Sequence, residues 1–308
     1  MKSDWVAASV RARSMAQHRI GAGACRDIAA QPSLSKALPL LANSAYAERL
    51  AGSTSLAAAE RSILDSVLWE LRVLAGWLPA NGTRVLRAMA AAYERDNIVA
   101  LAKELEGNLD IEEPYELGTL ATAWPQLQLS TTSEELVQAL EKSPWQRTGS
   151  TGVISLRDEL TLVWLRRLAN VAPPTRSWGA AASALILARV LVVDGDEIST
   201  RLTELIRPVL GQGWEKATGM AELRRALPKS VQSIFADIET PEELWRAEAR
   251  LRAKIQADGF NLLHHSTPGP EVVLGTAAVL AIDGWRIRVA LAAAAAGLGT
   301  SEVLDAVA

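Results

Sequence analysis

Few residues of this chain have the types and spacing that catalysis or metal binding requires. His264 and His265 are adjacent, but no third ligand stands at metal-binding spacing from them, so we expect a surface pair. The glycine-rich segment 21–25 does not follow a strand, which argues against a dinucleotide-binding loop. Residues 194–197 form an acidic turn without the remaining ligands of a calcium loop. The sequence therefore predicts no catalytic residue, no cofactor and no metal.

Arginine and tryptophan are the residue types that offer most for binding other proteins. The chain has 25 Arg against 7 Lys, and 10 Trp against 2 Phe. Arginine forms planar, bidentate ion pairs, and both types are frequent hot spots of interfaces. The alternative explanation of the arginine excess is the codon bias of a GC-rich genome. Four tryptophans lie near expected helix ends, where we expect mainly core packing with a partnered indole N–H: Trp145, Trp178, Trp214 and Trp285.

Composition excludes several classes of protein. The 308 residues are 49% hydrophobic, which suits one large unit or two to three domains. A net charge of −3 argues against a general nucleic-acid binder. Cys25 is the single cysteine, which agrees with a reducing cytosol. No uninterrupted apolar run reaches the roughly 20 residues of a membrane helix, since the nearest, 178–193, contains Arg189.

The elements that carry these residues are helical. Apolar residues recur every three or four positions between Ile63 and Leu78, which predicts one helical stripe. A second helix is expected from an N-cap at Asn81 to Gly107. The pattern predicts an all-α fold. Two short segments look strand-like, 153–156 and 191–193.

Two capping boxes mark further helix starts. Thr132 with Glu135, and Thr240 with Glu243, have the spacing in which each side chain caps the other's backbone. Gly259 is expected to end the helix that begins after Thr240.

A weak internal repeat runs through the chain. Three short amphipathic helices are expected at 34–46, 133–145 and 220–234, and their Ala-Leu pairs lie 102 and 87 residues apart. Each is followed by an Ala-rich helix with an arginine. The repeat predicts three helical units, 1–113, 114–212 and 213–308.

Several passages resemble the subunit called C or d of V/A-type rotary ATPases. Residues 5–13 (WVAASVRAR) are similar to the first helix of that family. Residues 91–101 (AAYERDNIVAL) resemble its arginine–aspartate/asparagine–leucine helix. Residues 117–120 (LGTL) followed by 134–145 resemble its glycine-threonine-leucine passage and short helix, and 270–299 resemble its last long helix.

The resemblance extends over residues 4–308 and is thinnest between 146 and 270. In its second and third units the family places acidic residues and Asn before its arginine. This chain instead reads AAASALILAR at 180–189 and IDGWRIR at 282–288. We therefore expect packing to replace polar contacts in these two helices.

The resemblance implies three similar helical bundles that form a funnel with pseudo-threefold symmetry. Its wide face would sit on the cytoplasmic end of the proteolipid ring, and its socket would receive the shaft subunits of the D and F type. Such a subunit transmits torque during ATP-linked proton or sodium transport and catalyses nothing. It is cytoplasmic and peripheral on the membrane, without a span of its own. The alternatives are an unrelated all-helical adaptor and a helical enzyme with a dispersed site.

Candidate partner-binding residues follow from the same expectation. Arg11 and Arg13 project about 200° apart on one helix, so one of them faces a partner unless both form solvated or internal pairs. Arg95 and Asn97 either line the socket or fix helix packing. Arg189, on an apolar helix, must find a partner or reach water. The seven candidates are Arg11, Arg13, Arg95, Asn97, Arg189, Trp285 and Arg286.

Overall fold

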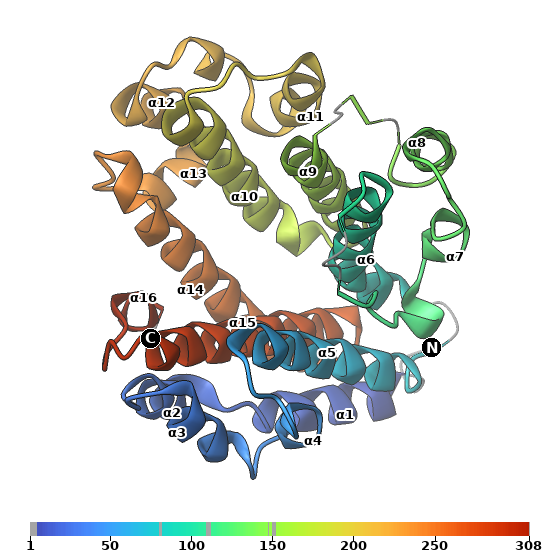
Figure 1. Ribbon diagram of the computed structural model, residues 1–308, viewed down its shortest axis with the longest axis vertical. Coiled ribbons are helices and arrows are strands. Elements are labelled where there is room, and N and C mark those ends of the chain that lie inside the picture. The colour runs from blue at the N-terminus through green and yellow to red at the C-terminus, as the bar shows by residue number, and fades with distance from the viewer. Residues whose placement is uncertain (1–4, 80–81, 109–111, 147, 150–151, 308) are drawn as a thin grey trace. The chain divides into compact units, whose positions relative to one another are not determined.

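The computed structural model describes residues 5–79, 82–108, 112–146, 148–149 and 152–307. All regular elements in these ranges are helical, which confirms the predicted all-α class (Figure 1). The chain packs as two compact units: unit 1 comprises Met1–Leu86 and Arg252–Ala308, and unit 2 comprises Arg87–Leu251. The predicted three-unit division at 1–113, 114–212 and 213–308 has other boundaries and stays a prediction.

Unit 1 is built around α15 (Pro270–Ala295), which packs against α1 (Val6–Gln17), α2 (Gly21–Ala29) and α5 (Leu56–Ala75) (Figure 1). Helix α15 buries residues on nearly every side because helices surround it. The predicted stripe of α5 is confirmed from Ile63 to Leu74. Shorter helices of unit 1 include α3 (Leu34–Ala37), α4 (Ala47–Leu50) and α16 (Glu302–Asp305).

Two glycines allow α14 (Leu244–Leu263) to approach α15 closely within unit 1. A Cβ atom added at Gly275 would lie 2.6 Å from the carbonyl oxygen of Gly259, and one added at Gly259 would lie 3.0 Å from a methyl of Val279. The prediction that Gly259 ends the helix is therefore wrong. Glycine serves there to bring two backbones together, so α14 continues to Leu263.

Unit 2 contains most of α6 (Arg84–Leu105) and a group formed by α9 (Val153–Val171), α10 (Arg176–Ala188) and α11 (Thr200–Leu210), which pack on one another (Figure 1). The indole N–H of Trp164 joins α9 to α6 by donating to the carbonyl oxygen of Ala88 at 2.8 Å. Short helices make up the rest: α7 (Trp124–Leu127), α8 (Ser133–Glu141), α12 (Met220–Ala226) and α13 (Lys229–Gln232).

Both strand-like segments are helical, which corrects the sequence prediction. Residues 153–156 form the first turn of α9. Residues 191–193 lie in a π-helical turn, Arg189–Asp194, that extends α10 and ends at Gly195 with a φ of 69°. Apolar runs this short carry no periodicity, so sequence alone does not separate a strand from a helix end.

The predicted caps are largely confirmed. The backbone N–H of Glu135 donates to Thr132 at 3.2 Å, and the Glu135 carboxylate accepts the backbone N–H of Thr131 at 2.8 Å. Thr240 and Glu243 form the complete capping box, which opens a 3-10 turn ahead of α14. Helix α6 ends before Gly107, whose φ is 91°. The expected N-cap Asn81 lies outside the described residues.

Candidate partner-binding residues

Arg11 and Arg13 meet different surroundings in unit 1. Arg11 is exposed on α1, and its charge opposes the rise that burial causes in the pKa of Glu70. Arg13 donates to the carbonyl oxygens of Leu263 at 3.1 Å and His265 at 2.6 Å, at the C-terminal end of α14. Carbonyl groups at a helix end have no partner within the helix. Arg13 therefore serves the fold, and Arg11 is the member of the pair that faces solvent.

Trp285 and Arg286 contribute to the interior of unit 1. Arg286 is 3% exposed, and its guanidinium donates to the side chain of Gln256 and to the carbonyl oxygen of Val307. Burial lowers its pKa. The half-buried ring of Trp285 lies 4.5 Å from the guanidinium carbon of Arg252. Trp285 stands in the middle of α15, so its expected position near a helix end is wrong.

A buried carboxylate, Asp283, joins α15 to the N-terminal helices of unit 1. It is 1% exposed and accepts the backbone N–H groups of Ile20 at 2.9 Å and Gly21 at 2.8 Å, where α2 begins. It also accepts the phenol of Tyr46 at 3.0 Å. A carboxylate at a helix N-terminus binds otherwise unpaired N–H groups and the positive end of the helix dipole. The expectation that packing replaces polar contacts at 282–288 is therefore wrong.

Unit 2 contains a matching carboxylate, Glu94 of α6, which is also 1% exposed. Its Oε1 accepts backbone N–H groups where α7 begins, from Thr122 at 2.8 Å, Ala123 at 2.7 Å and Trp124 at 2.8 Å. Its Oε2 accepts the indole N–H of Trp145 at 3.0 Å and the hydroxyl of Thr122. We expect a hydrogen-bond partner for the buried indole N–H of Trp145, and that partner is the Glu94 carboxylate of α6.

The two carboxylate networks share a local turn. In each, a serine two residues before the aromatic residue donates to a leucine carbonyl oxygen, at 2.7 Å in unit 1 and 2.8 Å in unit 2. The same serine accepts the backbone N–H of the aromatic residue, at 3.2 Å and 3.0 Å. These turns lie within the first two predicted repeat segments. The corresponding residues are Leu41, Ser44 and Tyr46 in unit 1, and Leu140, Ser143 and Trp145 in unit 2.

The two networks also correspond three residues after each carboxylate, where Asn97 follows Glu94 and Arg286 follows Asp283. Asn97 is 2% exposed, donates to the carbonyl oxygen of Tyr115 at 2.9 Å and accepts its N–H at 2.6 Å. Arg286 likewise reaches a backbone carbonyl, that of Val307. When AAASALIL (180–187) of α10 is aligned with AAAYERDN (90–97) of α6 on their three shared alanines, the fully buried Ala184 and Leu187 stand at these positions. Apolar side chains thus occupy these two positions of α10.

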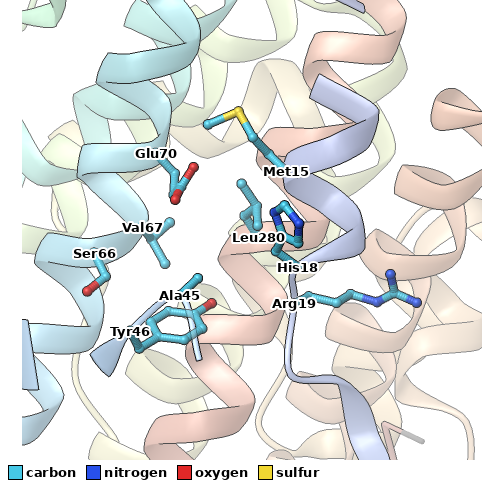
Figure 2. A pocket seen from close by; sticks show the side chains of 9 residues that line it. All are labelled: Met15, His18, Arg19, Ala45, Tyr46, Ser66, Val67, Glu70 and Leu280. Carbon is cyan, nitrogen blue, oxygen red and sulfur yellow. The ribbon is translucent and has the colours of Figure 1, made fainter. Parts of the chain in front are cut away.

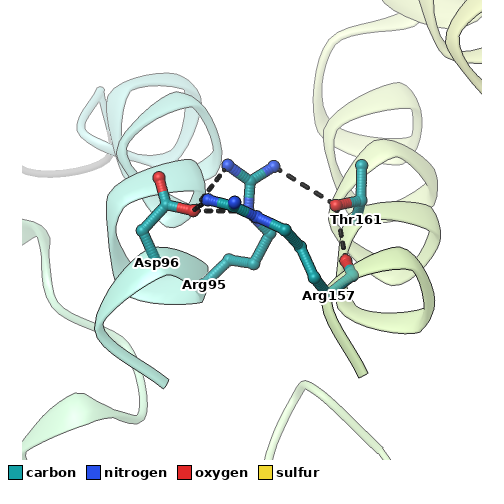
Figure 3. Close-up of polar contacts among 4 residues, drawn as sticks. All are labelled: Arg95, Asp96, Arg157 and Thr161. Carbon is teal, nitrogen blue, oxygen red and sulfur yellow. Dashed lines mark hydrogen bonds and ion pairs between the residues drawn. The ribbon is translucent and has the colours of Figure 1, made fainter. Parts of the chain in front are cut away.

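Arg95 of α6 faces α9. Its Nε and Nη2 donate to Oδ1 of Asp96 at 3.1 and 2.8 Å, and its Nη1 donates to the hydroxyl of Thr161 at 3.3 Å (Figure 3). Arg157 donates to the same Asp96 oxygen at 2.8 Å. The guanidinium of Arg95 also lies 5.5 Å from the ring centroid of Trp164. Arg157 was not predicted, although Arg157, Thr161 and Trp164 have the spacing of one helical face.

Arg189 finds the partners that its apolar helix requires. It donates to Asp158 of α9 and to Asp194 at 2.6 Å. Burial raises the pKa of Asp158, and the Arg189 charge opposes that rise.

Among the described helices, the continuous stretch Pro173–Asp194 has the length and hydropathy of a membrane span. It has 22 residues and a mean hydropathy of 1.5, and 44% of its apolar window is buried.

A small pocket lies between α1 and α5 in unit 1. Glu70 of α5 and His18, directly after α1, approach it beside the apolar side chains of Met15, Val67 and Leu280 (Figure 2). Burial raises the pKa of Glu70. The pocket contains none of the seven predicted residues.

Metal ligands do not gather in the part of the chain that the structure describes. No group of three or more His, Cys, Asp or Glu side chains there has a geometry that could hold a metal ion. Burial raises the pKa of the Cys25 thiol to about 12, which keeps it protonated and a poor nucleophile.

No protein-family model matches the chain, and no curated protein matches it in sequence.

Proposed function

We propose that this chain is a non-catalytic central-stalk subunit, of the C or d type, of a V/A-type rotary ATPase. In this role it couples the rotating shaft to the membrane proteolipid ring during ATP-linked proton or sodium transport. The observation that supports the proposal is the carboxylate network that occurs once in each unit, around Asp283 and around Glu94. A chain made of copies of one helical module is what the family resemblance implies.

The order of the module along the chain strengthens this argument. In unit 2 the carboxylate helix α6 comes first, followed by the capped helix α7, the serine–aromatic turn and the long helix α9. In unit 1 the carboxylate helix α15 comes last, whereas the capped helix α2, the turn and the long helix α5 lie at the N-terminal end. Segments from the N-terminal and C-terminal parts of the chain therefore form one module together within unit 1.

A third module would start with α10. That helix shares a run of three alanines with α6 but has Ala184 and Leu187 in place of the carboxylate and Asn97. The segment 220–234 and α14 would follow it. On this proposal the chain contains three copies of the module, whose boundaries differ from the predicted divisions at 113 and 212. In the third copy Arg250 of α14 donates to the carbonyl oxygens of Ile234 and Ala236.

The proposed role depends on stiffness. Close-packed helix interiors deform little under load. Charge-assisted hydrogen bonds from a buried carboxylate to several backbone N–H groups hold a short helix at a fixed distance from a long one. The proposed partners are the D- and F-type shaft subunits and the proteolipid ring, and the proposed location is the cytoplasmic face of the membrane. The role involves neither nucleic acid nor a cofactor.

Affinity purification from native membranes tests the proposal. The full chain would carry a tag in the organism that encodes it, and solubilised membranes would be purified and analysed by mass spectrometry. We expect ATPase head, shaft and proteolipid subunits in constant ratio, and loss of the chain from membranes washed free of peripheral proteins. Recovery with soluble proteins alone, without any ATPase subunit, would contradict the proposal and favour the unrelated helical adaptor.

A further inference from the structure

The pocket between α1 and α5 in unit 1 corresponds to a position that an arginine occupies in unit 2. Glu70 and Arg167 both lie 14 positions after the first residue of a long helix, Glu70 in α5 and Arg167 in α9. Each of these helices follows the serine–aromatic turn of its own carboxylate network. The same register brings buried positions of the two helices into agreement, since Ala59, Ile63, Leu68 and Leu71 correspond to Leu156, Leu160, Leu165 and Leu168.

In unit 2 the guanidinium of Arg167 covers the aromatic ring of the turn. Its central carbon lies 4.8 Å from the ring centroid of Trp145, and its Nη2 donates to the hydroxyl of Thr122 at 3.4 Å. Burial lowers the pKa of Arg167, and the charge of the Glu94 carboxylate opposes that fall. Unit 2 therefore shows which group suits this position: a planar cation that stacks on the ring close to a carboxylate.

In unit 1 no guanidinium covers the corresponding ring among the described residues. Tyr46 lines the pocket with its ring, and Glu70 stands where unit 2 has arginine (Figure 2). Arg19 also borders the pocket, but it donates to the carbonyl oxygen of Ala16 at 2.8 Å and lies 4.8 Å from the ring centroid of Phe260. The hollow measures about 310 Å³, including space open to solvent. This volume is near the lower limit for ligand sites, so it suits a small group.

The carboxylate of Glu70 forms no hydrogen bond or ion pair within the described part of the chain. Burial raises its pKa, and the charges of Arg11 and His18 oppose that rise without cancelling it. The surroundings of Glu70 therefore do not compensate fully for the water that burial removes. A cation placed in the pocket would supply this compensation.

We propose that the pocket of unit 1 binds a guanidinium group from outside the chain, that of an arginine residue of a partner protein or of free arginine. The guanidinium stacks on Tyr46, as Arg167 stacks on Trp145, and donates to the carboxylate of Glu70. The phenol of Tyr46 donates to Asp283 at 3.0 Å, so its ring is held in place before the ligand arrives. The inference is independent of the proposed function because it rests on the comparison of the two units.

NMR of methionine methyl groups tests the inference, because Met15 lines the pocket whereas Met89 and Met220 do not. The full chain, labelled with 13C at its methionine methyls, would be titrated with N-acetyl-L-argininamide, which has no charge besides the guanidinium. We expect a saturable shift of the Met15 signal alone. N-acetyl-L-citrullinamide has nearly the same shape without the charge, and it should bind about tenfold more weakly or less.

Substitution of the carboxylate provides the second arm. Glu70→Gln should raise the Kd of N-acetyl-L-argininamide about tenfold or more, because it removes the charge-assisted hydrogen bonds. Glu104→Gln makes the same chemical change at an exposed residue of α6 and should leave the Kd unchanged. Circular dichroism of each purified variant checks that it is folded.

The two sources of the guanidinium are separated by free L-arginine. A Kd for free L-arginine about tenfold or more below that of the blocked form supports the free amino acid as ligand, and a Kd equal to or above it supports an arginine residue of a partner protein. The same Kd for the arginine and citrulline amides overturns the inference, as does a Met15 signal that does not move. These comparisons use the wild-type chain, so they decide the question even if Glu70→Gln does not fold. An unchanged Kd in folded Glu70→Gln also overturns it.

Discussion

Replacing Glu94 by Gln tests whether the buried carboxylate holds the helices of unit 2 together. In the wild-type chain Glu94 accepts all five hydrogen bonds of its network, three from backbone N–H groups, one from the Trp145 indole and one from the Thr122 hydroxyl. A glutamine amide has one acceptor oxygen, and its NH2 group only donates. If that oxygen keeps the three backbone bonds, the NH2 group must face the Trp145 indole N–H.

The expected loss of stability is a few kilocalories per mole. A hydrogen bond to a charged group contributes about 1.5–3 kcal/mol, and a buried donor left without an acceptor costs about 1–3 kcal/mol. The substitution removes the charge from the whole network and leaves the Trp145 N–H without an acceptor, while it relieves the burial of a carboxylate. We expect the free energy of unfolding to fall by roughly 3–5 kcal/mol. For a unit of this size, each kcal/mol lowers Tm by about 2–4 °C.

Thermal unfolding and hydrogen exchange provide the assay. Circular dichroism would compare Glu94→Gln with wild type and with Glu104→Gln, a control at an exposed position of the same helix. Hydrogen exchange should increase at residues 122–124, whose amides bind the carboxylate. A Glu94→Gln chain with the Tm of the Glu104→Gln control, and unchanged exchange at these amides, would refute the reasoning.

Three further predictions concern unit 1. Gly275→Ala forces a Cβ atom against the α14 backbone and should cost about 3 kcal/mol or more in urea unfolding, whereas Gly23→Ala, which meets nothing within 4 Å, should be tolerated. Arg13→Ala should lower the free energy of unfolding by about 1–2 kcal/mol because it removes two bonds to the end of α14; a wild-type urea midpoint would contradict this. Burial raises the pKa of Glu70 above its ordinary value of 4.5, so ionisation disfavours the folded state and stability should fall as pH rises through and above 4.5. Glu70→Gln should remove that part of the pH dependence, and a pH profile of unfolding identical to wild type would show that Glu70 does not cause it.

Local features of the fold could be predicted from the sequence because their causes are local. The stripe from Ile63 to Leu74 follows from helical periodicity, and the Thr240–Glu243 box follows from the spacing of a cap. The role of Gly259 could not be predicted because the need for glycine there comes from α15, which packs against it, and not from its neighbours along the chain. The carboxylate of Asp283 was missed for the same reason, since its partners are more than 230 residues away in sequence.

The candidate site was predictable in part. Arg95 and Asn97 are two residues apart, so they leave α6 in different directions: the part-buried Arg95 pairs with Asp96, and Asn97 is buried against Tyr115. Residues 91–101, whose family resemblance suggests both as partner-binding residues, do not indicate which of the two is the more deeply buried. Arg157, which completes the surface cluster with Arg95, comes from another helix and has no motif of its own. Contacts between helices decide how each of these side chains is placed.

Electron cryo-microscopy of the complex purified through the tagged chain tests the central claim most directly. The account predicts this chain between the proteolipid ring and the shaft, with three alike helical modules arranged around the shaft end. A complex without ATPase subunits, or a chain whose modules do not surround the shaft, would contradict it.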